Sequence, residues 1–414
     1  MMGGVQRLRC SVKNYEWGKI GTESVVAGLC EKNCRVEIVL EKPYAEFWMG
    51  THESGPSVLV GYDGDGEGLN LRSWIERNPS VVGDGVVKKW GCDLPFLFKV
   101  LSVAKALSIQ AHPDKSLAKR LHESQPDLYK DDNHKPEMAL AVTEFEALCG
   151  FISIKELKDV LQSVPEIRDL VGYAYAKQVL SIHSEDQEDK VKTHVKSLFT
   201  QLMSANKGLV SDAISKFKNR LKSKEEITFK EQLVLRLEKQ YCNDVGVLAA
   251  FLMNYVKLKP GQALCLGANE LHAYVSGDCI ECMATSDNVV RAGLTPKNRD
   301  VQTLCSMLTY KLDLPEILEG TSVNKYVRKY RPPFEEFEVD RCILAMGTST
   351  SFPAIAGPSI FLVVKGEGRA RTDSFDEETI STGDVLFVSA NLEFILKTET
   401  HLELYRAGVN GEFL

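Results

Sequence analysis

A short run in which polar and apolar residues alternate, residues 107–112, constrains the fold of this chain more than any other segment. Successive side chains of a strand point to opposite faces, so Ser108, Gln110 and His112 are expected to line one side while the apolar residues between them line the other. Gln110 and His112 are both neutral metal donors. The run therefore predicts a strand that carries half of a metal site.

Two later segments offer the other half of such a site. Glu137 lies inside an apolar segment, and Pro136 biases Lys135 towards an extended conformation, so Lys135 and Glu137 are expected to share one face. His272 follows a strand-like run at 261–271. The predicted ligands are two nitrogens and two oxygens, from Gln110, His112, Glu137 and His272. Such a set suits zinc, although iron, manganese or cobalt could occupy the same ligands.

Six runs along the chain carry a family resemblance. They are KNYEWG at 13–18, YAEFWMGTH at 44–52, QAHPDK at 110–115, HKPEMA at 134–139, NELHAY at 269–274 and RAGLTPK at 291–297. In content and order they resemble the motifs of the type I phosphomannose isomerases, which belong to the cupin superfamily. The resemblance covers nearly the whole chain. One departure is Glu53, where proline is common in the family.

The resemblance implies a metal-dependent aldose-ketose isomerase. Such an enzyme interconverts mannose 6-phosphate and fructose 6-phosphate by proton transfer between C2 and C1 through an enediol or enediolate. One Zn²⁺ per chain would act as a Lewis acid on the sugar oxygens, and the only partner would be a small sugar phosphate.

Four residues are candidates for catalysis: Arg291, Glu281, Lys135 and His134. Glu281 lies in an otherwise apolar run, where desolvation would raise its pKa towards values useful for proton transfer. Lys135 competes for this role, and a salt bridge to Arg291 is the structural alternative for Glu281. By resemblance His134 would assist ring opening, and otherwise it is a surface histidine.

The candidates for substrate contact are Ser108, Lys99, Lys297, Tyr274, Trp17 and Glu46. Ser108, Lys99 and Lys297 would bind the phosphate, together with Arg291, which could instead stabilise a developing oxyanion. The others, with Trp48, would shape the sugar pocket, although aromatic residues more often belong to a core.

The middle of the chain changes to a helical period. Apolar residues recur at intervals of three and four in 191–203 and 210–221, and the Ser153/Glu156 and Thr228/Glu231 pairs have the spacing of capping boxes. The lysines of 190–224 are interrupted by acids, which indicates a solvated helix face rather than a nucleic-acid surface. This block predicts a helical insertion.

A weak internal repeat relates 261–269 to 383–391, with glycine, leucine, alanine and asparagine at matching positions. Its register puts Phe394 where the first copy has His272. The prediction is a mainly β fold with two cupin-like jelly-roll barrels and an α-helical domain. Residues 1–150 and 242–325 would form the metal-binding catalytic domain, 151–241 the helical insertion, and 326–414 a C-terminal jelly roll without a metal site.

Composition limits the remaining possibilities. A chain of 414 residues with a net charge of -7 predicts two or three domains and offers no basic excess for nucleic acid. No run of about 18 apolar residues is long enough for a membrane span, and 1–10 does not resemble a signal peptide. The eleven irregularly spaced cysteines, among them Cys279 and Cys282, are expected to be free thiols rather than a metal site. A cytoplasmic monomer is the expectation.

Two other classes of protein fit part of the pattern. A non-haem iron oxygenase on the same barrel also uses two histidines and a carboxylate, and oxygen consumption with a 2-oxo acid would identify it. A double barrel that binds sugar phosphate without converting it is the second alternative.

Overall fold

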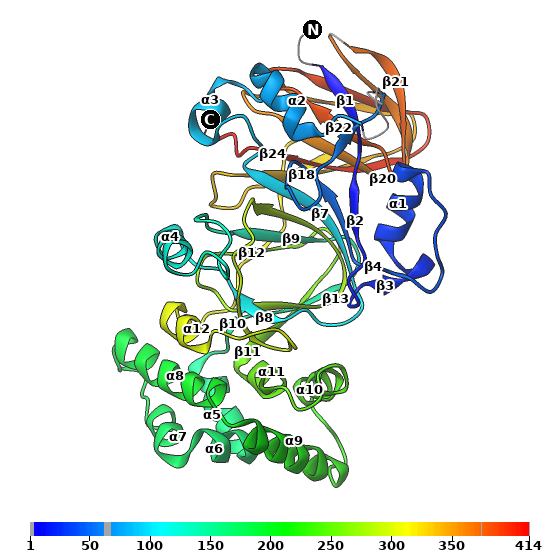
Figure 1. Cartoon of the computed structure of the whole chain (residues 1–414). Helices are drawn as coiled ribbons and strands as arrows, with labels where there is room; N and C mark the ends of the chain where they lie inside the picture. The colour runs from blue at the N-terminus through cyan, green and yellow to red at the C-terminus, as the bar shows by residue number, and fades with distance from the viewer. Residues whose placement is uncertain (1–3, 62–67, 374, 414) are drawn as a thin grey trace.

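The computed structural model describes residues 4–61, 68–373 and 375–413. The fold is mixed α/β: two mostly antiparallel sheets of eleven strands each and a block of helices follow one another along the molecule (Figure 1). The sheet in the middle, here called the central sheet, consists of β2 (Ser11–Lys13), β5 (Glu46–Met49), β7 (Phe96–Val103), β8 (Ile109–Ala111), β9 (Glu137–Ala141), β10 (Phe145–Phe151), β11 (Met253–Leu258), β12 (Ala263–Leu266), β13 (His272–Ala284), β14 (Val290–Gly293) and β15 (Ile317–Leu318).

The second sheet, here called the terminal sheet, holds both ends of the described chain (Figure 1). It consists of β1 (Val5–Arg9), β6 (Val58–Leu59), β16 (Thr321–Ser322), β17 (Val327–Tyr330), β18 (Glu338–Leu344), β19 (Thr348–Phe352), β20 (Ser359–Thr372), β21 (Phe375–Ser381), β22 (Val385–Val388), β23 (Phe394–Thr398) and β24 (Leu402–Gly408). A small separate pair is formed by β3 (Lys19–Ile20) and β4 (Pro43–Tyr44).

The helical block lies at the far end from the terminal sheet (Figure 1). It consists of α5 (Ile154–Ser163), α6 (Pro165–Val171), α7 (Tyr173–Leu180), α8 (Glu188–Met203), α9 (Lys207–Lys222), α10 (Phe229–Gln240) and α11 (Val245–Ala249). The other helical segments are η1 (Gly21–Glu23), α1 (Val25–Cys34), α2 (Leu71–Arg77), η2 (Pro79–Val81), α3 (Asp84–Trp90), α4 (Lys115–Ser124), η3 (Ala250–Leu252) and α12 (Val301–Met307).

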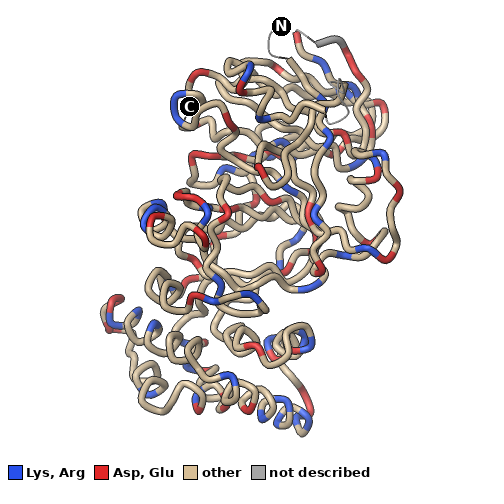
Figure 2. Tube along the Cα trace, in the orientation of Figure 1, with Lys and Arg blue, Asp and Glu red and all other residues tan. Residues whose placement is uncertain are grey.

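Both predicted capping boxes are present and begin helices of this block. Ser153 and Glu156 satisfy the first turn of α5, and Thr228 and Glu231 do the same for α10. Acidic and basic residues are interspersed along these helices (Figure 2). The helical insertion is therefore confirmed.

Alternation along β7 gives the central sheet two different faces. Phe96, Phe98 and Val100 pack into a core that also contains residues of the terminal sheet, so this core joins the two sheets. The intervening Leu97, Lys99 and Leu101 face a cavity. The one polar residue of the three is thus directed at the cavity rather than at the core.

One long strand in each sheet bends and pairs with different neighbours on either side of the bend. The first part of β13 pairs with β8 and β10, and the part from Gly277 onward pairs with β7 and β9. In the same way, the part of β20 up to Gly366 pairs with β24, and the part that follows pairs with β21. The φ angles of Gly277 and Gly366, 111° and 86°, favour glycine. A Cβ atom on Gly277 would lie 2.3 Å from a backbone oxygen, and one on Gly366 would lie 1.8 Å from another. Each sheet therefore folds over on itself.

The internal repeat corresponds to matching backbone geometry. Gly261 and Gly383 have φ angles of 91° and 92°, and Asn269 and Asn391 have φ angles of 61° and 63°. The strands that follow begin at His272 and at Phe394 respectively, as the repeat predicts. Phe394 is buried and packs on Phe361 with ring centroids 4.4 Å apart, so an aromatic core residue stands where the first copy has a histidine.

Two details differ from the predicted pair of barrels. Within the described residues, neither sheet closes into a continuous ring of paired strands. Strands β1 and β6 pair into the terminal sheet, although they precede residue 150, and β16 joins it before residue 326. Strand pairing across a fold of this size is set by tertiary contacts that local alternation does not encode. The domain division at 151, 242 and 326 stays a prediction.

No helix in the described ranges combines the length and the apolar character needed to cross a membrane.

Candidate active site

The strand register brings distant polar residues together. Gln110 on β8 pairs with His272 at the start of β13, and Glu137 at the start of β9 pairs with Met283 at the other end of β13. The alternation predicted around Gln110 is confirmed for Ile109 and Ala111, which lie in an apolar core on the opposite side. Leu107, expected on that side as well, instead lines the cavity with Ser108, because it precedes the strand. Glu137 pairs near one end of β13, and yet His272 at the other end of that bent strand contacts it.

Two histidines face one buried carboxylate. The Nε2 atom of His112 lies 3.4 Å from one oxygen of Glu137, and the Nε2 atom of His272 lies 3.4 Å from the other oxygen. The ligand atoms of the three residues all lie within 4.8 Å of one another. Gln110 is adjacent to this group through its pairing with His272.

The hydrogen bonds of the three residues fit a bound cation. His112 Nδ1 lies 2.7 Å from the carbonyl of Asn288 and His272 Nδ1 lies 3.0 Å from that of Glu270, so each Nδ1 acts as the donor. The opposite nitrogens, and Oε2 of Glu137, are buried without a hydrogen-bond partner among the described residues. Burial also lowers the pKa of His112 to about 4, which favours the neutral, metal-binding form. These donors suit zinc.

Further hydrogen bonds join the two segments that carry His112 and His272. Asp114 accepts a hydrogen bond from the side chain of Asn269 at 2.9 Å and also caps helix α4. The backbone N–H of Asn269 donates to the carbonyl of His112 at 2.7 Å. The left-handed backbone conformation of Asn269 lets its side chain bond to Asp114 while its N–H bonds to His112.

A cavity of about 460 Å³ opens beside Glu137. Most of the residues proposed from the sequence line it, namely Trp17, Glu46, Lys99, Ser108, Gln110, Lys135, Glu137, Tyr274, Glu281, Arg291 and Lys297. His112 and His272 contact Glu137 directly. Burial raises the pKa of Tyr274 well above its usual value, so this phenol stays neutral in the cavity wall.

The partner of Glu281 is Lys99 and not Arg291. The Nζ atom of Lys99 donates to Glu281 at 2.9 Å and lies 3.6 Å from Glu46. Burial alone would lower the pKa of Lys99, but the two carboxylates outweigh it and raise that pKa. Burial also raises the pKa of Glu281, with a smaller opposing effect from Lys99. The sequence could not identify this pair, whose members are 182 positions apart.

Three other cations line the cavity, and none of them has an acidic partner among the described residues. In the part of the chain that the structure describes, no carboxylate oxygen lies within 4.0 Å of the charged nitrogens of Lys105, Arg291 or Lys297. Lys105 instead lies over the ring of Tyr241, 4.2 Å from its centroid. Burial lowers the pKa of Arg291, the expected effect on a cation without a counter-charge.

Unlike the other proposed site residues, His134 neither lines the cavity nor contacts Glu137. Its Nε2 atom lies 2.6 Å from the buried carboxylate of Glu336, in the segment before β18. His134 therefore connects the segment before β9 to the terminal sheet. The role in ring opening expected for His134 stays a prediction, and this contact would hold its ring beside Glu336.

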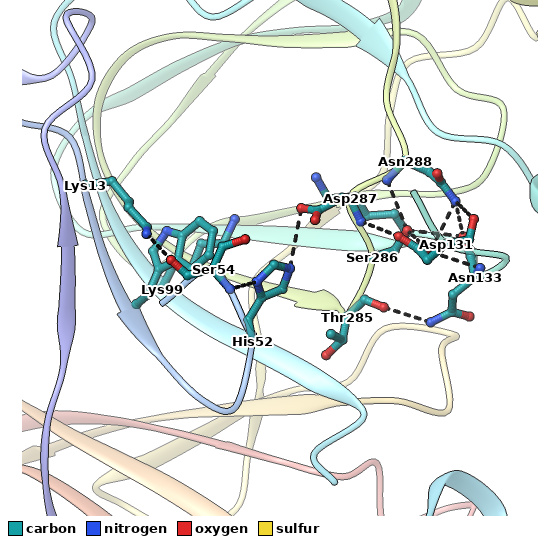
Figure 3. A network of polar contacts seen from close by, with 12 residues as sticks. Lys13, His52, Ser54, Lys99, Asp131, Asn133, Thr285, Ser286, Asp287 and Asn288 are labelled. Carbon is teal, nitrogen blue, oxygen red and sulfur yellow. Dashed lines mark hydrogen bonds and ion pairs between the residues drawn. The ribbon is translucent and has the colours of Figure 1, made fainter. Parts of the chain in front are cut away.

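Sequence reasoning missed several polar residues of the cavity lining, namely Tyr15, Glu16, His52, Lys105, Tyr241, Ser286, Asp287 and Thr295. Tyr15 and His52 lie within runs that carry the family resemblance, which is a signal that could have found them. Figure 3 shows the ion pair between His52 and Asp287, which lie on separate loops. The Nε2 atom of His52 lies 3.4 Å from a carboxylate oxygen of Asp287. Cys279 and Cys282, which were expected to be free thiols, are buried and unpaired and lie in different cores.

Comparisons with known proteins agree with this arrangement. The family described as "Phosphomannose isomerase type I, catalytic domain" matches residues 5–154, and "Phosphomannose isomerase type I, helical insertion domain" matches residues 170–253. "Mannose-6-phosphate isomerase 1" of Arabidopsis thaliana is 59% identical, over 99% of this chain and 95% of that protein.

Solved structures match over almost the full length. A mutant of phosphomannose isomerase from Salmonella typhimurium is 28% identical with a TM-score of 0.83, covering 98% of this chain and 99% of that one. A mannose 6-phosphate isomerase bound with zinc and yttrium is 28% identical with a TM-score of 0.82, at the same coverage. The fold, the clustered ligands and these matches lead to one conclusion: the chain belongs to the type I phosphomannose isomerase family.

Proposed function

We propose that this protein is a mannose-6-phosphate isomerase that interconverts mannose 6-phosphate and fructose 6-phosphate. The observation that carries the proposal is the buried group of His112, Glu137 and His272 beside a cavity lined by cations. The two histidine Nε2 atoms and one oxygen of Glu137 have no hydrogen-bond partner among the described residues. The names of the relatives describe the same activity. An anionic sugar fits such a cavity.

The metal would be held by His112, Glu137 and His272, with Gln110 as the proposed fourth ligand. When bound there, a zinc ion supplies a Lewis acid that polarises the sugar oxygens near C1 and C2. One carboxylate among these four ligands leaves the site with a net positive charge, which suits an electrophilic role.

The phosphate is proposed to bind among the cations without acidic partners. Arg291, Lys297 and Lys105 are available for an anion because no carboxylate within the described residues neutralises them. Ser108 can donate its hydroxyl to a phosphate oxygen. Lys99 was also expected to bind phosphate, but its contacts with Glu281 and Glu46 favour a role in holding Glu281.

Glu281 is proposed as the group that moves the proton between C2 and C1. It lines the cavity and lies in a buried strand, where burial raises its pKa and so increases its basicity. Lys135 is the competitor, and its Nζ atom lies 3.5 Å from Glu137. Its position beside a metal ligand favours stabilising the enediolate oxygen by charge.

The walls of the sugar pocket are proposed to be Trp17, Tyr274 and Glu46. Trp17 stacks with Tyr15 at a centroid distance of 5.8 Å, and Glu46 accepts a hydrogen bond from Trp48 at 2.6 Å. Fixed side chains of this kind orient a substrate without reorganising.

We further propose a monomer, in a reducing compartment such as the cytoplasm, with no nucleic-acid partner. The cavity is built from one chain, so it requires no second subunit. All eleven cysteines are unpaired, and the net charge is -7.

A coupled assay tests the function directly. Purified protein supplied with zinc is expected to convert mannose 6-phosphate into fructose 6-phosphate and to run the reverse reaction. Failure to form product in either direction would refute the proposal. Oxygen uptake with a 2-oxo acid would instead identify the iron oxygenase, and binding of the sugar phosphate without conversion would identify a binding protein.

A further inference from the structure

Two loops beside the metal ligands form a hydrogen-bonded unit. One loop, residues 131–133, lies between α4 and β9, and the other, residues 285–288, lies between β13 and β14. Figure 3 shows Asp131, Asn133, Ser286 and Asn288 in contact across the two loops. Ser286 and Asn288 are buried.

Asp131 is the centre of this unit. One oxygen of its carboxylate accepts hydrogen bonds from the hydroxyl of Ser286 at 2.8 Å and from the side chain of Asn288 at 3.2 Å. The other oxygen accepts from the backbone N–H of Asp287 at 2.8 Å. The backbone carbonyl of Asp131 accepts a further bond from Asn288 at 2.7 Å. One side chain thereby fixes three consecutive residues of the opposite loop.

Asn288 connects this unit to a metal ligand. Its carbonyl lies 2.7 Å from Nδ1 of His112 and so determines which way the ring turns Nε2. Its side chain also donates to the carbonyl of Asn133 at 2.9 Å, four positions before Glu137. The unit therefore joins the carbonyl that orients His112 to the segment that leads into Glu137.

We infer that Asp131 is a positioning residue of the metal centre, which acts through Ser286 and Asn288 to hold His112 and Glu137 in register for the ion. This inference deepens the proposed function and rests on its metal site. A carboxylate suits this position because it only accepts hydrogen bonds, and the groups around it are all donors. An amide in its place would direct an N–H towards another N–H.

The test is the affinity of metal-free protein for Zn²⁺, measured by competition with a chromophoric chelator. Asp131→Asn is expected to weaken zinc binding by about tenfold to a hundredfold, the usual effect of losing such a support. Ser286→Ala, which removes a single hydroxyl, is expected to weaken it in the same direction. At saturating zinc Asp131→Asn should recover most of the wild-type kcat, because Asp131 supports the ligands without replacing any of them. Ser286 lines the cavity, so Ser286→Ala is compared by its zinc affinity alone.

Asp132→Asn is the matched control. Asp132 is the next residue of the same loop and is exposed, and none of its atoms makes a hydrogen bond or ion pair to the rest of the described chain. Its zinc affinity should equal that of the wild type, and so should its thermal unfolding without metal.

Equal zinc affinity of Asp131→Asn, Ser286→Ala and Asp132→Asn would overturn the inference while leaving the proposed function intact. Lack of zinc binding by the wild type would overturn both. If Asp131→Asn unfolds before titration, Ser286→Ala decides between support and refutation in the same assay.

Discussion

At the scale of single residues, Glu281 and Lys135 compete for the proton transfer, and their surroundings distinguish them. Glu281→Gln keeps the size of the side chain but removes its basicity, and Lys99 retains Glu46 as a partner at 3.6 Å. We expect kcat to fall by roughly 10²–10⁴-fold, the usual contribution of a general base. Metal content should be unchanged, since Glu281 is not among the ligands. Steady-state kinetics with elemental analysis of the same sample checks both expectations.

Lys135→Met is the companion variant for this prediction. A full rate in Glu281→Gln together with a lost rate in Lys135→Met would exchange the two roles. Loss of metal from Lys135→Met alone would show that its contact with Glu137 supports the ligand.

The residues that the sequence could predict are those whose signal is local. Alternation around Gln110 and the family runs were enough to nominate His112, Glu137 and His272. The choice of Lys99 as the partner of Glu281, and of Glu336 as the partner of His134, depends on segments brought together from 182 and 202 positions apart. No local pattern contains that information, because register and domain contact decide which charges meet.

At the scale of elements, the end of helix α10 holds the rim of the cavity. The hydroxyl of Tyr241 donates to the carbonyl of Ala106 at 2.6 Å, and the side chain of Gln240 accepts from the N–H of Ala106 at 3.0 Å. Ala106 lies between Lys105 and Ser108, just before strand β8, which carries Gln110. The helical insertion therefore fixes the loop that leads into the metal-binding strand.

Tyr241→Phe tests this connection, because it removes the hydroxyl and keeps the ring under Lys105. A hydrogen bond is worth about 0.5–1.5 kcal/mol, so KM for mannose 6-phosphate should rise by roughly twofold to tenfold with kcat little changed. Tyr255→Phe is the control, since its hydroxyl contacts Glu146 outside the cavity lining. An unchanged KM in Tyr241→Phe would show that the insertion does not support the substrate site.

The elements themselves were predictable where periodicity and turn chemistry agree. The capping boxes at Ser153 and Thr228 and the repeat ending at Asn269 and Asn391 appear as expected. The sequence could not predict that β1 and β6 pair with the terminal sheet, because their short apolar runs fit either sheet equally well.

At the scale of the whole molecule, the terminal sheet contains a buried ionic network that makes stability depend on pH. Glu338 accepts from Arg406 at 3.1 Å and also contacts Lys329. Burial alone would raise the pKa of Glu338, but Arg406 and Lys329 outweigh it and lower that pKa to about 2. A carboxyl with a lowered pKa stabilises the fold above its unfolded pKa, and this contribution is lost as the pH falls from about 4.5 to about 2.

Glu338→Gln is expected to reduce the free energy of unfolding near neutral pH by about 3 kcal/mol and to flatten its loss in acid. Denaturant unfolding between about pH 3 and about pH 7 measures both effects. Glu399→Gln is the control, because Glu399 is exposed and pairs only with Lys397 among the described residues. Parallel pH profiles for Glu338→Gln and the wild type would exclude this account of acid stability.

The central claim for the whole molecule is that distant strands converge on one divalent ion that turnover requires. The direct measurement is zinc content and isomerase rate on the same samples of wild type and His272→Ala, before and after chelation. We expect one zinc per wild-type chain, loss of activity on chelation with recovery on adding zinc, and neither metal nor activity in His272→Ala. Full activity in metal-free protein would contradict the account.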